Sequence, residues 1–358
     1  MNTSTDVAGS FIKYLIENGV SDFVISPGSR NAPLSIALYE ASKKGLIDLH
    51  IKIDERGAAF FALGLSKASD NYVAVTCTSG TAVANYLPAA LESLHSDSKV
   101  IFLTADRPEH LRKTGANQTT NQVDIFNGIK TYDLDYFEPV ALKAGPIHIN
   151  LKFDEPLLTE DKSDWLAGIS VTPSVSSPPT VKEKLNVSGN GLVIVGHDKG
   201  GFTKTEISNF ARGLPLISED PASFPESIEG ASLFLADLKV RDYLKPDYVI
   251  VIGRTTLSRS INSFVAFAPK QYVIDKRLRR IDSERKATKL FEQFPELEIE
   301  SIAESYRRDF EIASRESKVD LNWSEPFIAR TLVGEIPDEA ALFVGSVSYT
   351  HLTLPTKA

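Results

Sequence analysis

Short apolar runs alternate with longer amphipathic segments along the first 170 residues of the chain. The apolar runs have the length of strands, and the expected strands are Phe23–Ile25, Leu49–Ile53, Tyr72–Thr76, Val100–Leu103 and Ile147–Leu151. The longer segments predict a helix at Val7–Asn18, a second that follows the loop Ser26–Pro33 and ends at about Lys43, a third from Glu55 to about Ser69, and a fourth at Ala82–Leu94. This alternation predicts an α/β fold with an open, mainly parallel sheet covered by helices.

A second α/β unit begins after a stretch rich in proline and serine. Its expected strands are Leu192–Gly196, Leu214–Ile217, Tyr248–Ile252 and Gln271–Asp275. A third unit begins near Trp323, with a helix expected at Phe327–Val333 and a strand at Ala341–Val344. The predicted organisation is a first unit at 1–170, a linker at 171–190, a central unit at 191–322, the start of a third unit at 323–346 and a tail at 347–358.

The tail at 347–358 has no pattern that continues an α/β domain. It resembles translated sequencing-adapter sequence, so we interpret it as foreign and expect the natural protein to be longer.

Composition and charge exclude several classes of protein. The formal net charge of −8 argues against nucleic acid or an anionic membrane surface as the main partner. No apolar run approaches the roughly 20 residues needed to span a bilayer, so no membrane insertion is expected. The one cysteine, Cys77, ends an apolar run and is interpreted as a buried structural thiol; it excludes an intrachain disulfide and favours the reducing cytoplasm. The six histidines lack metal-ligand spacing.

Glu55 is the strongest single candidate for chemistry. It follows an expected strand and opens an expected helix, so it lies at the sheet edge where open α/β sheets bind ligands. On position alone, the alternative that Glu55 only complements the helix dipole is favoured.

Three loops are expected at the same edge. Ser26–Arg30 offers backbone amides, hydroxyls and a guanidinium for an anion, and Thr78–Thr81 offers small residues against which a flat ligand can lie. Asp106–Pro108, followed by Gly115–Gln118, adds an arginine and two amide side chains. Each loop alone is also explained by ordinary turn and helix-cap chemistry, and their joint occurrence is harder to explain in that way.

These motifs, together with Gly145–Asn150 and Phe153–Leu157, closely resemble the 2-succinyl-5-enolpyruvyl-6-hydroxy-3-cyclohexene-1-carboxylate synthase family of menaquinone biosynthesis. Enzymes of this family use thiamine diphosphate. The resemblance implies tandem open parallel-sheet domains, of which 1–170 is the pyrimidine-binding domain and 323–346 the start of the diphosphate-binding domain. It covers the first domain strongly and the central domain more loosely.

The resemblance also implies the roles of individual residues. Glu55 would hydrogen-bond N1' of the cofactor's aminopyrimidine, for which it should be shielded from water and have a raised pKa. The other cofactor-binding residues would be Pro27, Thr78 and Ser79. The substrate-binding residues would be Ser29, Arg30, Arg107, Asn117 and Gln118.

The implied reaction is decarboxylation of 2-oxoglutarate and 1,4-addition of the resulting succinyl-semialdehyde unit to isochorismate, in a homodimer or homotetramer. Mg²⁺, with Mn²⁺ as an alternative, would bind in the third domain, which the family carries beyond a strand like Leu342–Gly345. We expect that domain to be missing here and this chain to be inactive by itself. The stretch Val123–Ala144 is also short, whereas the family usually carries a longer segment with a further helix there.

Three other interpretations remain open. The chain is alternatively a non-catalytic module that binds an anionic metabolite at Arg30 and Arg107, or another thiamine-diphosphate-dependent 2-oxo acid decarboxylase or carboligase. A nucleotide site at Gly196–Gly201 is weakly supported, because the loop matches neither GxGxxG nor a P-loop. The basic segment Lys276–Arg280 is interpreted as a solvated surface loop.

Overall fold

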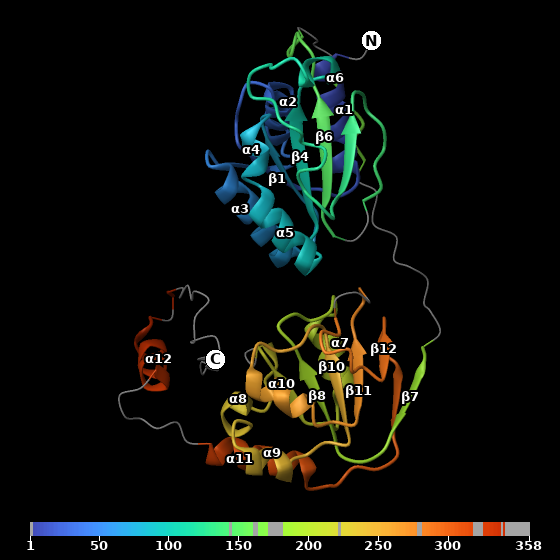
Figure 1. Cartoon of the computed structure of the whole chain (residues 1–358), viewed down its shortest axis with the longest axis vertical. Helices are drawn as coiled ribbons and strands as arrows, with labels where there is room; N and C mark the ends of the chain where they lie inside the picture. Colours follow the sequence, from blue (N-terminus) through green and yellow to red (C-terminus); the bar gives the residue numbers. More distant parts are fainter. Residues whose placement is uncertain are drawn as a thin grey trace. The chain divides into compact units, whose positions relative to one another are not determined.

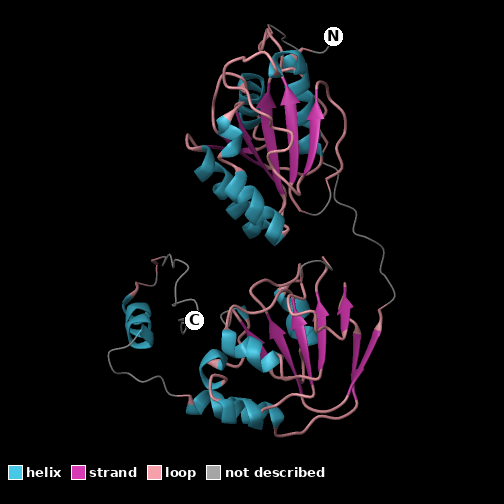
Figure 2. Ribbon diagram, viewed as in Figure 1, coloured by secondary structure: helices cyan, strands magenta, loops and turns pink. Residues whose placement is uncertain are grey.

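The computed structural model describes residues 3–142, 145–159, 164–170, 182–220, 223–277, 281–317, 325–337 and 339–340. The chain forms two compact units, Met1–Pro178 and Pro179–Ala358, each with its own parallel sheet (Figures 1 and 2). The predicted α/β class with tandem open parallel sheets is confirmed. Within the described residues, no helix is both long and apolar enough to cross a lipid bilayer.

The first unit is built on a six-stranded sheet in the order β2-β1-β3-β4-β6-β5, in which every pairing is parallel. Its strands are β1 (Asp22–Ile25), β2 (Asp48–Ile51), β3 (Val73–Cys77), β4 (Val100–Asp106), β5 (Lys130–Leu134) and β6 (Ile147–Lys152). The chain moves outward from β1 to β2 and then returns to β3 on the other side of β1. This reversal creates a switch point between β1 and β3, where α/β sheets bind ligands.

Helices cover both faces of this sheet (Figure 1). They are α1 (Ser4–Glu17), α2 (Ala32–Lys43), α3 (Glu55–Ser69), α4 (Thr81–Ala84), α5 (Leu87–Ser96) and α6 (Glu109–Arg112). α1 and α2 pack in one core cluster, and α3 and α5 in the cluster on the opposite face. α1 illustrates how the sequence determines packing: Thr3 and Asp6 form a capping box, and Val7, Phe11 and Leu15 place one buried face on the sheet.

Two details of the first unit differ from the expected elements. The single helix expected at Ala82–Leu94 is divided into α4 and α5, because Pro88 has no N–H to continue the helical ladder and instead opens α5. The short stretch Val123–Ala144 contains the edge strand β5, which pairs with β6 and was not predicted. No helix forms in the described part of that stretch, residues 123–142.

The second unit has a five-stranded parallel sheet in the order β12-β11-β10-β8-β9 and a separate parallel pair, β13 and β7. Its strands are β7 (Lys184–Val187), β8 (Gly191–Val195), β9 (Leu216–Ser218), β10 (Tyr248–Ile252), β11 (Lys270–Ile274), β12 (Lys289–Phe291) and β13 (Glu296–Ile299). Its helices are α7 (Lys204–Phe210), α8 (Ala231–Phe234), α9 (Leu238–Tyr243), α10 (Arg259–Val265), α11 (Tyr306–Glu316) and α12 (Glu325–Glu335).

The core of the second unit has two layers. Buried residues of α8, α10 and α11 pack on one face of the five-stranded sheet. Buried residues of α7 and of the β7–β13 pair pack on the other face. The sheet is therefore covered on both sides, as its almost uniformly apolar strands require.

The predicted linker at 171–190 is wrong at its C-terminal end, because residues 184–187 form β7. Lysine and asparagine alternate there with buried Leu185 and Val187, a period-two pattern of a half-buried strand. Residues 171–181 of the predicted linker lie outside the described residues, as do the expected strand at Ala341–Val344 and the tail at 347–358. The helix expected at Phe327–Val333 lies within α12.

The basic segment Lys276–Arg280 is not simply solvated. Arg277 is largely buried and forms ion pairs with Asp198 at 2.7 Å and Asp275 at 2.5 Å. Residues 278–280 lie outside the described residues. The expectation of a solvated loop is therefore wrong for Arg277, which connects β11 to the loop after β8.

Candidate functional site

The carboxyl ends of β2, β1, β3 and β4 lie in register along one edge of the first sheet. Ile25 pairs with Ile51 on one side and with Thr76 on the other, and Cys77 pairs with Thr104. Because the strands are parallel, the segments that follow them emerge at the same edge. Glu55, the loop from Ser26, the loop from Thr78 and the segment from Asp106 therefore follow one another along this edge.

Glu55 is the first residue of α3, and its neighbour Asp54 is the N-cap. Asp54 Oδ2 accepts a hydrogen bond from Gly57 N at 2.7 Å, so the capping role belongs to Asp54 and not to Glu55. Glu55 Oε2 accepts one long hydrogen bond, 3.5 Å from Asn85 Nδ2. The side chain is partly exposed, so the shielding from water expected for Glu55 is not found in this chain.

Two buried acidic groups lie near Glu55. Burial raises the pKa of the Cys77 thiol and of the Tyr86 phenol, and the negative charge of Glu55 raises both further. The prediction of a buried structural thiol at Cys77 is confirmed, because its side chain is fully buried. Both groups therefore stay protonated and uncharged at neutral pH.

Arg30 joins the first loop to the second and to the end of β6. Its backbone N–H donates to Thr78 Oγ1 at 3.3 Å, and its Nη1 donates to the carbonyl oxygen of Phe153 at 3.1 Å. Its Nη2 lies 3.6 Å from Glu155 Oε1. The close approach of the two loops requires glycine at position 28, because a Cβ there would lie 2.5 Å from Thr78 Cβ.

Arg107 connects the second loop to the segment after α6. Its Nη1 donates to Ser79 Oγ at 2.7 Å and to the carbonyl oxygen of Gln118 at 2.8 Å, and Ser79 Oγ donates to the same carbonyl at 3.0 Å. Burial lowers the pKa of Arg107, and the nearby positive charge of Arg30 lowers it further. The two guanidinium groups therefore repel each other, and an anion bound near both would offset that repulsion.

Gly80 fixes the position of the Thr78–Thr81 loop. Its φ of +83° is one that other residues rarely adopt, and a Cβ would lie 2.9 Å from the carbonyl oxygen of Gln118. Its N–H donates to Gln122 Oε1 at 2.8 Å. The segment Gln118–Gln122 thus holds the loop through Ser79 and Gly80.

A buried polar network behind these loops was not predicted from the sequence. Arg112 pairs with Asp106 at 2.8 Å and with Asp133 at 2.7 Å, and Asn150 Nδ2 donates to both carboxylates. Gln122 Nε2 donates to Asn150 Oδ1 at 2.8 Å, which links the network to Gly80. The sequence did contain one signal for this network, the polar residues within otherwise apolar strands, because buried polar residues need hydrogen-bond partners.

The two carboxylates of this network differ in their acidity. Burial raises the pKa of Asp106 despite the opposing effects of Asn150 and Arg112. Burial also acts to raise the pKa of Asp133, but hydrogen bonds from Arg112 and Asn150 outweigh it, so the pKa of Asp133 is lowered. Asp133 therefore stays ionised, and its negative charge balances the positive charge of Arg112.

The structure brings together five of the predicted site residues and leaves others more separate. Direct contacts join Arg30 to Thr78, and Ser79 to Arg107 and Gln118. The Gln118 contact is made by its backbone carbonyl, while the Gln118 side chain is exposed. Pro27, Ser29 and Asn117 are exposed at the same edge. Among the described residues, no group of three or more His, Cys, Asp and Glu side chains is arranged to hold a metal ion.

Residues 5–125 match the family model described as "Thiamine pyrophosphate enzyme, N-terminal TPP binding domain". The chain is also similar to several proteins named 2-succinyl-5-enolpyruvyl-6-hydroxy-3-cyclohexene-1-carboxylate synthase. The one from a Nocardioides species is 39% identical over 79% of this chain and 52% of its own length. Those from Bacillus velezensis and Lysinibacillus sphaericus are 30% and 31% identical, each over 96% of this chain and 69% of its own length.

The chain thus spans about half of the Nocardioides relative and about two thirds of the Bacillus and Lysinibacillus relatives. The matched region includes Glu55, the Arg30 loop and the Thr78 loop, the three segments that meet at the sheet edge. The chain belongs to the 2-succinyl-5-enolpyruvyl-6-hydroxy-3-cyclohexene-1-carboxylate synthase family of thiamine-diphosphate enzymes.

Proposed function

We propose that this chain provides the pyrimidine-binding half of a thiamine-diphosphate-dependent carboligase, a transferase of menaquinone biosynthesis. The complete enzyme would decarboxylate 2-oxoglutarate and add the four-carbon product to isochorismate in a 1,4 fashion. The observation that carries the proposal is Glu55, a partly exposed carboxylate at the start of α3, on the same sheet edge as the arginine pair Arg30 and Arg107.

The described residues fit the aminopyrimidine part of the cofactor. Glu55 accepts a single long hydrogen bond, so its oxygens have capacity to accept from a ring nitrogen. Asp54 holds the helix start, which fixes the backbone of Glu55. When bound, thiamine diphosphate supplies a nucleophilic carbon that makes the decarboxylation of a 2-oxo acid accessible. Glu55 would bind the ring and hold the proton at the ring nitrogen, while Pro27, Thr78 and Ser79 would line the ring.

The arginine pair would bind the carboxylates of isochorismate and 2-oxoglutarate. Arg30 is oriented by the Phe153 carbonyl, and Arg107 by Ser79 and the Gln118 carbonyl, so both guanidinium planes are fixed before substrate arrives. A fixed guanidinium pairs with a carboxylate at a defined angle, which lysine does not reproduce. Ser29, Asn117 and Gln118 would donate hydrogen bonds to substrate from the exposed rim.

The complete enzyme would also need a divalent metal ion and a second subunit. Mg²⁺, or Mn²⁺ in its place, would bind together with the cofactor's diphosphate in the part of the relatives that this chain does not span. The working enzyme would be a homodimer or homotetramer in the cytoplasm. Covering Glu55 with a second subunit would supply the shielding that the single chain lacks.

The test uses this chain joined to the portion of a relative that lies beyond its match. Calorimetric titration with thiamine diphosphate and Mg²⁺ should show binding, and 2-oxoglutarate should then be decarboxylated. Glu55→Gln should lower kcat by about 100-fold or more while the fold is retained, because general acid–base contributions are of that size.

Glu138→Gln, at an exposed position of the same unit, is the matched control and should leave kcat unchanged. Failure of the joined protein to bind the cofactor or to decarboxylate 2-oxoglutarate would refute the enzyme assignment. Near-normal turnover in Glu55→Gln would refute the role of Glu55 alone.

A further inference from the structure

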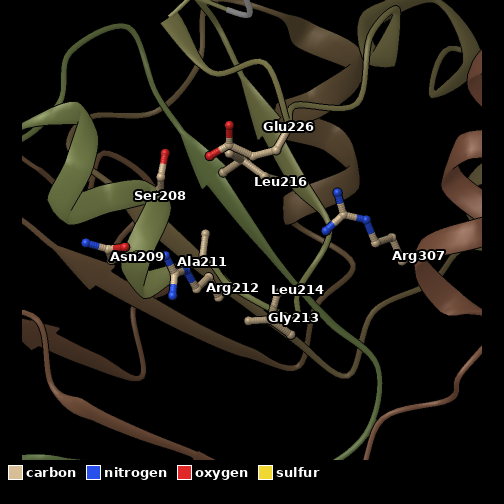
Figure 3. A pocket seen from close by; sticks show the side chains of 9 residues that line it. All are labelled: Ser208, Asn209, Ala211, Arg212, Gly213, Leu214, Leu216, Glu226 and Arg307. Atoms are coloured by element: carbon tan, nitrogen blue, oxygen red, sulfur yellow. The ribbon is translucent and has the colours of Figure 1, made fainter.

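The second unit contains a hollow of about 290 Å³ at the β9 edge of its five-stranded sheet (Figure 3). β9 is the edge strand, and α7 and α11 belong to the core layers on opposite faces of the sheet. Leu214 and Leu216, which are buried, and Ala211 form an apolar floor. Charged side chains of three different segments surround this floor.

Glu226 is held at the hollow by the segment that covers the edge of β9. Ile228, two residues later, donates a backbone hydrogen bond to the Leu216 carbonyl at 2.7 Å, and the adjacent Ser227 Oγ accepts one from Ser218 N at 3.0 Å. These bonds pair the segment with β9 in place of another strand. The position of Glu226 is therefore set by the sheet itself.

The Glu226 carboxylate has one oxygen without a hydrogen-bond partner among the described residues. Its Oε1 is buried and accepts no hydrogen bond in the described structure. A buried polar atom without a partner is costly, and a charged one especially so. Glu226 also lines the hollow, so its negative charge favours a ligand that brings a hydrogen-bond donor, and an ammonium group satisfies both the charge and the hydrogen bond.

Arg307 and Arg212 provide the opposite charge. Arg307 lies on α11 between the buried residues Tyr306 and Phe310, and its Nε donates to Glu311 Oε1 at 3.3 Å. Figure 3 shows Arg307 and Glu226 among the side chains that line the hollow, with the exposed Arg212 on the side of α7. Within the described part of the chain, no ion pair within 4 Å joins Glu226 to either arginine, so a small molecule has room between them.

These charges narrow the class of ligand. A simple anion would lie against the Glu226 carboxylate, and a metal cation would face two guanidinium groups with one carboxylate ligand. An uncharged apolar molecule would cover the floor and leave Glu226 without a donor. Only a molecule that carries both a positive and a negative group can pair with Glu226 and with the two arginines.

We propose that this hollow binds a small zwitterion, an α-amino acid with an aliphatic side chain. Its ammonium group donates to Glu226, its carboxylate pairs with Arg307 and Arg212, and its side chain packs on Ala211, Leu214 and Leu216. The site is separate from the proposed cofactor and substrate site, since all its residues belong to the second unit. It therefore stands whether or not the proposed function holds.

The first experiment uses the unaltered 358-residue chain and three probes of one shape. L-Leucine carries both charges, 4-methylpentanoate lacks the ammonium group, and 3-methylbutylamine lacks the carboxylate. Isothermal titration should give a Kd of about 1 mM or tighter for leucine and a Kd at least about tenfold weaker for each of the other two. No binding of leucine, or equal binding of the three probes, overturns the proposal.

The second experiment compares variants with matched controls on the same segments. Glu226→Gln and Arg307→Gln should each weaken leucine binding by about tenfold or more, whereas Glu229→Gln and Arg308→Gln, which lie outside the hollow and are exposed, should not. Circular dichroism of each variant without ligand checks the fold. Leucine binding that resists both substitutions in folded variants, or that falls equally in the controls, contradicts the assignment of these residues.

Discussion

His148 is a buried imidazole between two threonine hydroxyls. Thr104 Oγ1 lies 2.8 Å from His148 Nε2, and Thr131 Oγ1 lies 3.1 Å from Nδ1. Because the Thr104 hydroxyl donates to Asn150 Oδ1, it accepts from Nε2–H, which leaves Nδ1 to accept from Thr131. Burial lowers the pKa of His148 to about 3, and the negative charge of Asp133 opposes this only in part. The folded protein therefore holds a neutral imidazole.

This histidine makes stability depend on pH in a defined direction. Below its unfolded pKa of about 6.5, the imidazole takes up a proton in the unfolded chain but not in the folded one, so stability is complete above that pH and falls as the pH decreases toward 3. Between pH 7 and pH 5 the free energy of unfolding should fall by about 2 kcal/mol through this group. His148→Gln should remove that share, as measured by urea denaturation at both pH values.

His95 provides the control for this experiment. It is exposed on α5, so His95→Gln should leave the difference between pH 7 and pH 5 unchanged. An equal pH dependence in the native protein and in folded His148→Gln would show that the imidazole is not held neutral.

The contacts of individual site residues were only partly predictable. Sequence position was enough to place Glu55, Arg30, Ser79 and Arg107 at one sheet edge, because parallel strands end together. It did not show that Gln118 acts through its carbonyl, since that contact depends on its left-handed φ of 56°. The partners of Arg112 were also hidden, because they come from β4 and from an unpredicted strand.

The N-terminus of α3 combines a structural acid with a functional candidate. Asp54 caps the helix through Gly57 N, so Asp54→Ala should lower the free energy of unfolding by about 1 kcal/mol. Asp54→Asn retains an acceptor oxygen and should cost much less. Thermal denaturation of the two variants measures the difference, and equal destabilisation would show that the capping bond contributes little.

Two of the strands that were not predicted, β5 and β7, share a physical cause. β5 reads Lys-Thr-Tyr-Asp-Leu and β7 reads Lys-Leu-Asn-Val, and neither has the continuous apolar run that marked the central strands. Both lie at the edge of a sheet or in a two-stranded pair, where one side of the strand meets solvent. Their pairing partners, β6 and β13, provide the stabilisation that local sequence does not show.

Each unit of the molecule has its own core. Buried residues of the first unit form two clusters from that unit alone, and those of the second unit do the same. Phe310 is fully buried among Phe234, Phe264 and Tyr306 in the second unit. Phe310→Ala should destabilise that unit by about 3–5 kcal/mol and leave the first unit unaffected.

Trp165 makes this prediction measurable. It belongs to the first unit, where its Nε1 donates to Glu40 at 2.7 Å, and Trp323→Phe leaves it as the one tryptophan of the chain. In that background, Phe310→Ala should shift part of the circular dichroism transition to lower temperature without shifting the Trp165 fluorescence transition. Phe11→Ala, in the core of the first unit, should shift the fluorescence transition. If Phe310→Ala shifts both transitions equally, the two units unfold as one.

The full burial of Cys77 has a practical consequence for the whole chain. It is the one thiol in 358 residues, and burial keeps it protonated, so thiol-reactive reagents have no accessible target in the folded protein. A cysteine introduced at an exposed position, such as Asn209 at the rim of the hollow, would then be labelled selectively. The sequence thus already serves as a background without an accessible cysteine for spectroscopic labels.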